Sequence, residues 1–235
     1  MMKPAFTLIT RRLLLGALAL TMAGCIDLAG LKQPPMQTAY YVLEYEPAAI
    51  AAEPVPAVVR VNRFTAAPLF STTGMIYKKK SFQTEAYVYH RWHTAPADMV
   101  SHLLARDMER SGLFPAVFGP TGSTLASYAV EGHIETFLED DTADPWQAEL
   151  RLTIVLTDLR ATGDGAAAVL FQKSYQATEP CPRNHPRAFA EAMSRAMANV
   201  SREIITDICQ AIGKRENSRK SPGAGNSLNA EPKDL

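Results

Sequence analysis

The stretch WQAELRLTIVLTDLRA, residues 146–161, decides the fold that this sequence predicts. Apolar side chains occupy every second position through its centre, which is the period of a β-strand with one buried face. Two further stretches alternate in the same way: YAVEGHIETFLED, residues 128–140, and AVLFQKSYQATE, residues 168–179. An acidic turn joins the first two stretches and a glycine-rich turn joins the last two, so together they predict an antiparallel meander. Strands of this length are expected to twist or bulge.

Outside the meander, the apolar period changes at two places from that of a strand to that of a helix. Residues 94–112 carry one apolar stripe, and a longer stripe runs from Pro186 to Ile212, after which Gly213 is expected to end the helix. Runs rich in aromatic and β-branched residues predict further strands at 38–45, 56–64, 74–80 and 84–92. The sequence therefore predicts an α/β fold in which two amphipathic helices lie on a sheet.

The composition indicates one domain and excludes a strong electrostatic partner. Residues 38–213 hold enough apolar side chains for a single core, whereas residues 214–235 hold almost none and are predicted to be a disordered tail. Lysine and arginine together number 24, the same as aspartate and glutamate, so no net field attracts nucleic acid. Nucleic-acid binding is therefore not expected.

The amino terminus carries an export signal, RRLLLGALALTMAGCIDLAG at residues 11–30. Its apolar run is shorter than the roughly 20 residues of a membrane-spanning helix, and basic residues precede it. Ala23 and Gly24 stand directly before Cys25, which resembles a bacterial lipobox. Residues 1–24 are predicted to be a lipoprotein signal peptide, Cys25 the acylated first residue of the mature chain, and residues 25–37 a flexible tether.

A plain signal peptide followed by a coincidental cysteine is the alternative at this terminus. The residue after Cys25 is Ile26 rather than the aspartate that favours retention in the inner membrane. We therefore expect a lipid anchor in the outer membrane, with the domain facing the periplasm.

The other two cysteines, Cys181 and Cys209, invite a disulfide that geometry forbids. About 23 helical residues at roughly 1.5 Å each put Pro186 about 35 Å from Cys209. The few residues back to Cys181 recover only about half of that distance, and a disulfide needs Cα atoms within about 7 Å. Two free thiols are predicted, with Cys181 accessible and Cys209 buried in the helix stripe.

Residues with catalytic or metal-binding chemistry are present, but no pattern organises them. The segment HRWH pairs His90 with His93, but a catalytic zinc site needs a third protein ligand that the sequence does not indicate. Glu131, Glu135 and Glu139 share one strand parity, opposite to the apolar positions, and are expected on a solvated face. No enzyme activity, cofactor or metal is predicted.

One group of aromatic residues offers a candidate surface for a hydrophobic ligand or a partner protein: Tyr77, Tyr87, Tyr89 and Trp92. Tyr87 and Tyr89 are expected on the same side of their strand, with Trp92 following at the turn into the helix. The alternative is that these rings cover one end of the core, as amphipathic rings often do.

The order of these segments resembles a known family. The lipobox, the opening strand YYVLEY, the segment YVYHRW with a proline shortly after it, the helix ADMVSHLLARDMERSGLF and the long closing helix are similar to those of ABC-type transport auxiliary lipoproteins, the partners of mammalian-cell-entry (MCE) systems of the paraquat-inducible type. The resemblance implies a layered α/β sandwich with a mixed, largely antiparallel sheet, similar to the amino-terminal domain of TolB-like proteins.

The resemblance also implies a role without catalysis. The chain would be a membrane-anchored component of a machine that moves lipids or other hydrophobic molecules across the bacterial envelope. Its partners would be an MCE-domain periplasmic protein with its ABC permease and ATPase, and a homo-oligomer is plausible. The alternative function is a lipoprotein that assists assembly or stability of an outer-membrane complex.

Overall fold

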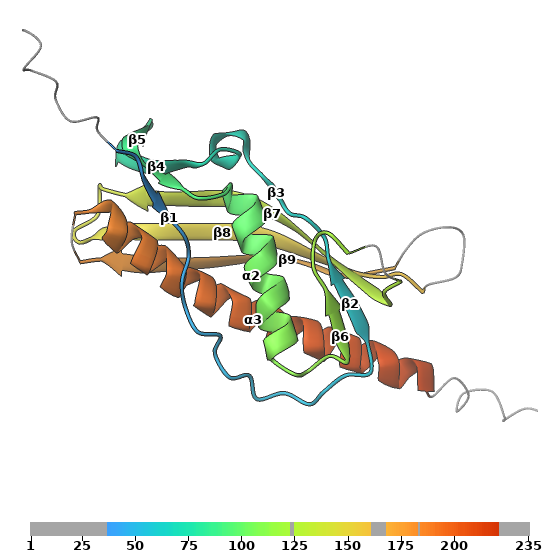
Figure 1. The fold of residues 1–235 in the computed structure, drawn as a ribbon. Helices are drawn as coiled ribbons and strands as arrows, with labels where there is room; N and C mark the ends of the chain where they lie inside the picture. Colours follow the sequence, from blue (N-terminus) through green and yellow to red (C-terminus); the bar gives the residue numbers. More distant parts are fainter. Residues whose placement is uncertain (1–36, 123–124, 161–167, 183, 221–235) are drawn as a thin grey trace, which may run out of the picture. The chain divides into compact units, whose positions relative to one another are not determined.

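A computed structural model describes residues 37–122, 125–160, 168–182 and 184–220. The signal peptide, Cys25 and most of the tether lie outside the described residues, as do residues 221–235. The predicted meander is present as β7 (Tyr128–Asp140), β8 (Trp146–Asp158) and β9 (Ala168–Cys181), paired antiparallel in sequence order. It forms the largest part of the sheet (Figure 1).

The remaining strands are shorter, and most of them pair parallel to their neighbours. They are β1 (Ala39–Tyr41), β2 (Val58–Val61), β3 (Thr65–Ala66), β4 (Gly74–Lys80), β5 (Gln83–Trp92) and β6 (Ala116–Phe118), with a 3-10 turn η2 at Pro68–Phe70. β2, β3 and β4 each pair parallel with a different part of β7, while β4 and β5 form an antiparallel hairpin. The nine described strands make one mixed sheet whose longest pairings are antiparallel, so the implied fold class is confirmed.

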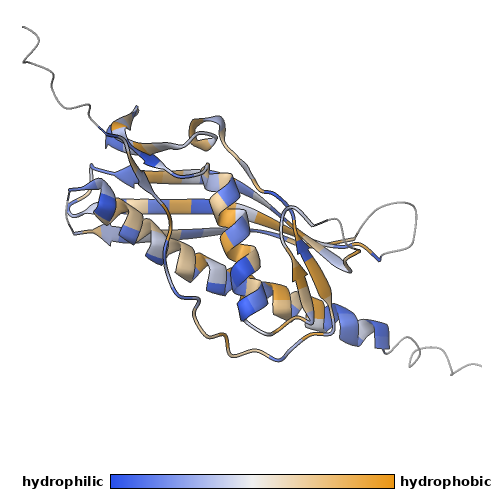
Figure 2. Ribbon diagram, viewed as in Figure 1, coloured by the Kyte–Doolittle hydropathy of each residue, from blue (hydrophilic) through white to orange (hydrophobic). Residues whose placement is uncertain are grey.

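The core lies between this sheet and two helices on one of its faces, α2 (Pro96–Arg110) and α3 (Pro186–Lys220) (Figure 1). β8 shows how the sequence produces this layer, because its side chains alternate between buried and more exposed positions. The buried apolar set of β8 is Ala148, Leu150, Leu152, Ile154 and Leu156. These side chains meet the apolar stripe of α3, and Figure 2 shows both helices with hydrophobic residues interleaved with hydrophilic ones.

The residues at the helix ends explain where three of the four ends fall. Ala95 precedes α2 and Pro96 stands in its first turn, while Gly112 follows its end with φ of +66°, a left-handed stop. His185 opens α3, because its Nδ1 accepts a hydrogen bond from the Arg187 backbone N–H. The prediction that α3 ends at Gly213 is wrong, since the helix continues to Lys220.

β7 contains an irregularity that changes which side chains are buried. Its register against β8 shifts between Ile134 and Thr136, which is the signature of a bulge that inserts one extra residue. Side chains that face the helices therefore have even numbers before the bulge and odd numbers after it. Glu131 remains exposed as predicted, but Glu139 is fully buried, so its predicted place on a solvated face is wrong.

A buried carboxylate fastens the two helices to the loop after β1. Asp107 of α2 is buried although it is charged. Its Oδ2 accepts hydrogen bonds of 2.6 Å from the Tyr45 hydroxyl and of 2.6 Å from Ser201 of α3, while Arg106 bonds its other oxygen. A buried charge is tolerated when it is paired and hydrogen-bonded in this way.

Candidate functional site

Two of the predicted aromatic residues, Tyr77 and Tyr87, lie together at the β4–β5–β1 edge of the sheet. The rings of Tyr77 and Tyr87 lie 4.8 Å apart, Tyr87 meets His90 at 5.8 Å, and His90 meets Tyr41 at 5.7 Å. The Tyr41 hydroxyl also bonds His90 Nδ1 at 3.0 Å. These four half-buried residues form what we call the aromatic row. The sequence singled out two of them; Tyr41 lies on another strand, and its pairing with β5 was not predicted.

Two of the predicted residues lie outside the aromatic row. Trp92 is fully buried, with its ring 5.3 Å from Phe137 and 5.3 Å from Phe189, so it belongs to the core and the surface prediction is wrong for it. Tyr89 is exposed to solvent. Both residues depart from the prediction because the β4–β5 register shifts between Gly74 and Ile76. This shift leaves extra residues in β5 before Arg91. That irregularity breaks the alternation on which the prediction rested.

A buried acid lies directly beside the aromatic row. The Tyr87 hydroxyl donates a 2.6 Å hydrogen bond to Glu139 Oε2, whereas Glu139 Oε1 accepts no such bond from nitrogen or oxygen within the described chain. Burial raises the pKa of Glu139 to about 7, although the bond from Tyr87 opposes the shift. Burial and the neighbouring Asp140 raise the pKa of Asp141 to about 6. This end of the sheet therefore holds carboxyl groups that titrate near neutral pH.

The histidines of the HRWH segment separate in the structure. His90 joins the aromatic row, whereas His93 packs edge-on against the ring of Tyr40 at 6.3 Å. Among the residues that the structure describes, no group of three His, Cys, Asp or Glu side chains is placed to hold a metal ion. The two thiols are free, as predicted, but both are buried, so the expected accessibility of Cys181 is wrong.

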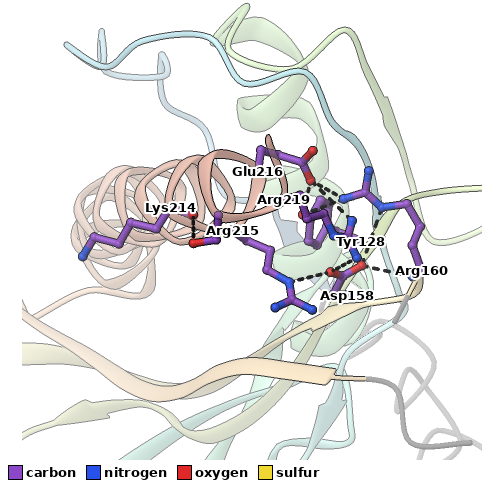
Figure 3. A network of polar contacts seen from close by, with 8 residues as sticks. Tyr128, Asp158, Arg160, Lys214, Arg215, Glu216 and Arg219 are labelled. Atoms are coloured by element: carbon purple, nitrogen blue, oxygen red, sulfur yellow. Dashed lines mark hydrogen bonds and ion pairs between the residues drawn. The ribbon is translucent and has the colours of Figure 1, made fainter. Parts of the chain in front are cut away.

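An ion-pair network lies around the last turns of α3 (Figure 3). Asp158 at the end of β8 is fully buried and accepts bonds from Arg215 Nε at 3.1 Å and from Arg219 at 2.7 Å. Glu216 pairs with Arg160 and accepts a hydrogen bond from the Tyr128 hydroxyl. The network therefore fastens the end of α3 to both β7 and β8, a contact that sequence analysis missed because it assigned this segment to the tail.

A groove of about 630 Å³ runs between β9 and α3, next to this network. Leu170 and Phe171 line it from the strand, and Ala211 lines it from the helix. Lys173 reaches across to Asp207 of α3 at 2.6 Å, and the Tyr175 hydroxyl donates to the same carboxylate. The groove is open and partly apolar, and these polar bonds fix its two walls.

Comparison with known proteins decides the family. A family model described as the ABC-type transport auxiliary lipoprotein component matches residues 41–205. The chain belongs to this family. The match begins at Tyr41 of the aromatic row and includes Glu139, but it ends before the arginines of α3 that surround Asp158.

Solved structures share the fold of this auxiliary lipoprotein component. The crystal structure of protein XCC0632 from Xanthomonas campestris, of the DUF330 family, is 18% identical and has a TM-score of 0.67, covering 77% of this chain and 99% of its own. A second crystal structure, of an uncharacterized protein, is 12% identical with a TM-score of 0.56, covering 73% of this chain and 99% of its own. No curated protein matches the sequence.

The family description is that of an auxiliary component in ABC-type transport, which implies association with an ABC transporter. The features available for contact are the aromatic row, the groove beside β9 and the exposed hairpin of β4 and β5. No helix within the described ranges is both long enough and apolar enough to span a bilayer.

Proposed function

We propose that the chain is a non-catalytic, lipid-anchored auxiliary subunit of an ABC-type transporter of the MCE kind, which moves lipids or other hydrophobic molecules across the bacterial envelope. The family match over residues 41–205 carries this proposal. The lipobox before Cys25 supports the anchor, and the sorting rule for the next residue supports the outer membrane facing the periplasm.

The anchor is tested by replacing the acylated residue. Cys25→Ala is expected to abolish acylation and to release the chain from sedimented membranes, because acyl chains supply roughly 0.8 kcal/mol per buried methylene. Met22→Leu is the matched control, since it places the commoner residue in the lipobox and should leave acylation unchanged. Unchanged acylation of Cys25→Ala, measured by mass spectrometry, would overturn the anchor.

The partner is tested by purification from the envelope. The detergent-solubilised chain is expected to bring down an MCE-domain periplasmic protein with its permease and ATPase, together with co-purifying lipid. The mass of the purified complex also reports self-association. Recovery of an outer-membrane assembly complex without any ABC subunit would favour the alternative function.

The aromatic row is part of the proposal, as the surface that meets the hydrophobic cargo or the MCE partner. It combines stacked rings with a buried acid, and amphipathic tyrosines are common at such contacts. Tyr77→Ser is expected to weaken partner or lipid recovery while the chain stays folded, because Tyr77 lies at the outer end of the row. Tyr89→Ser, on the same hairpin but outside the row, is the control and should leave recovery unchanged.

A further inference from the structure

The turn of the β4–β5 hairpin carries a side chain that the fold does not need. Phe82 is completely exposed, and its backbone has φ of +64°, in the left-handed region that glycine and asparagine favour. A bulky aromatic residue at this position lowers the stability of the folded domain in two ways: its backbone is strained, and its apolar ring stays in water. Strain of this kind at an exposed turn indicates a contact outside the domain.

The residues around Phe82 indicate the chemistry of that contact. β4 ends in Lys78, Lys79 and Lys80, of which Lys78 pairs with Asp140 and Lys79 with Glu85. Lys80 makes no ion pair with any residue that the structure describes. On β5, the exposed positions that alternate after the turn are uncharged: Thr84, Ala86 and Val88. An apolar tip flanked by lysines and followed by an uncharged stripe suits the boundary between phospholipid headgroups and acyl chains.

The distance from the turn to the start of the domain allows the turn and the anchor to meet the same bilayer. β1 pairs parallel with β5, with Ala39 opposite His90 and Tyr41 opposite Trp92. Both strands therefore run away from the hairpin turn, and β1 begins opposite His90, eight residues after Phe82 and roughly 26 Å along β5 from the turn (Figure 1). The tether is long enough to cover this distance. Twelve residues separate Cys25 from Thr38, which reach at most roughly 40 Å.

We propose that the β4–β5 turn docks on the bilayer that holds the acylated Cys25, with the Phe82 ring inserted at the level of the acyl-chain boundary. Lys79 and Lys80 then lie near the phosphate groups of anionic phospholipids. This inference rests on the proposed lipid anchor. The turn adds a second contact, which fixes the orientation of the domain on the membrane, whereas the anchor alone fixes only its distance.

The test uses the full chain, produced in a bacterial envelope, purified in detergent and reconstituted into vesicles of phosphatidylethanolamine and phosphatidylglycerol in a 3:1 ratio. Phe82→Trp places a fluorophore at the turn, and lipids brominated along their acyl chains quench it only on contact. Leu125→Trp is the matched control: Leu125 is also almost fully exposed but precedes β7, whose far end pairs with Lys78 roughly 40 Å away. Unmodified chain supplies the signal of the two native tryptophans.

Brominated lipid is expected to quench the fluorophore of Phe82→Trp at least twofold more than that of Leu125→Trp. Equal quenching in the two variants would overturn the docking of the turn, and vesicle flotation in the same sample would then show whether the anchor still holds. Loss of flotation would contradict the anchor instead. Adding vesicles of brominated lipid to the chain and measuring the quenching of Phe82→Trp would then show whether the turn contacts a bilayer without the anchor. A bimane label on Phe82→Cys repeats the measurement, because Cys181 and Cys209 are buried. If Phe82→Asn loses partner recovery and Phe82→Trp shows no quenching, the turn contacts a protein, and its docking on the bilayer is overturned.

Discussion

Replacing Glu139 with glutamine should make the domain more stable at high pH than at low pH relative to the unmodified chain. The folded state holds this carboxyl with a pKa of about 7 because it is buried, whereas an unfolded chain ionises it near 4.5. A raised pKa of an acid means that the folded state binds its proton more tightly. The carboxyl therefore costs stability progressively as pH rises from about 4.5 to about 7, and the full cost remains above that range.

The size of the effect follows from the two pKa values. At pH 8 the linkage relation gives a cost of about 3 kcal/mol, and at pH 5 it gives about 1 kcal/mol. Glutamine does not ionise and keeps an oxygen that accepts the bond from Tyr87. The gain in unfolding free energy of Glu139→Gln should therefore be roughly 2 kcal/mol larger at pH 8 than at pH 5, whatever constant cost its amide adds.

Urea unfolding of both chains at the two pH values measures this difference. Glu131→Gln is the matched control, because Glu131 lies on the same strand before the bulge and is exposed. Its substitution should change stability by less than about 0.5 kcal/mol at either pH. An equal gain for Glu139→Gln at both pH values would refute the burial of an acid at this position, and with it the reversed side-chain parity after the bulge.

Three further outcomes test other parts of the structure. Neither Cys181 nor Cys209 should react with an alkylating reagent in the native chain, because burial raises the pKa values of these thiols to about 12 and about 11, and both should react in urea, as counted by mass spectrometry. Asp158→Asn should lower the urea unfolding free energy by about 1–3 kcal/mol, while Asp98→Asn, which removes a surface ion pair, should lower it by less than about 1 kcal/mol. Phe82→Gly should raise the melting temperature, by an amount equivalent to about 1 kcal/mol, since glycine adopts positive φ without strain; an unchanged or lower temperature would contradict the strain.

The sequence predicted the elements whose side chains follow a regular period. The alternation in β8 gave its buried face, and the stripe of α3 gave the apolar side that packs on it. Parallel pairing of β2, β3 and β4 along β7 was not predictable from the residues, because no local signal states which strand will be its neighbour. The mixed sheet was predicted from the family resemblance and not from the residues themselves.

The site was predicted less well, because two irregular registers decide it. One inserted residue in β7 turned Glu139 inward, and extra residues in β5 placed Trp92 in the core instead of on the surface. Strand alternation assigns each side chain to one face of the sheet by counting residues along the strand. A single inserted residue therefore reverses the face of every side chain that follows it. The sequence had indicated that the long strands would bulge, but nothing in it located the position.

The predicted end of α3 was wrong for a different reason: a charged segment can be solvated or can form ion pairs with another part of the fold, and its sequence does not distinguish the two. Residues 214–220 hold almost only polar and charged side chains, shown as the hydrophilic end of α3 in Figure 2, and such composition is typical of a solvated tail. Here Arg215 and Arg219, one turn apart, face the buried Asp158, which lies 57 residues before Arg215 in the chain. Gly213 does not take the left-handed backbone that would stop the helix, whereas Gly112 does. Charged residues extend a helix when opposite charges on another element meet them, and composition counted over a window cannot include that partner.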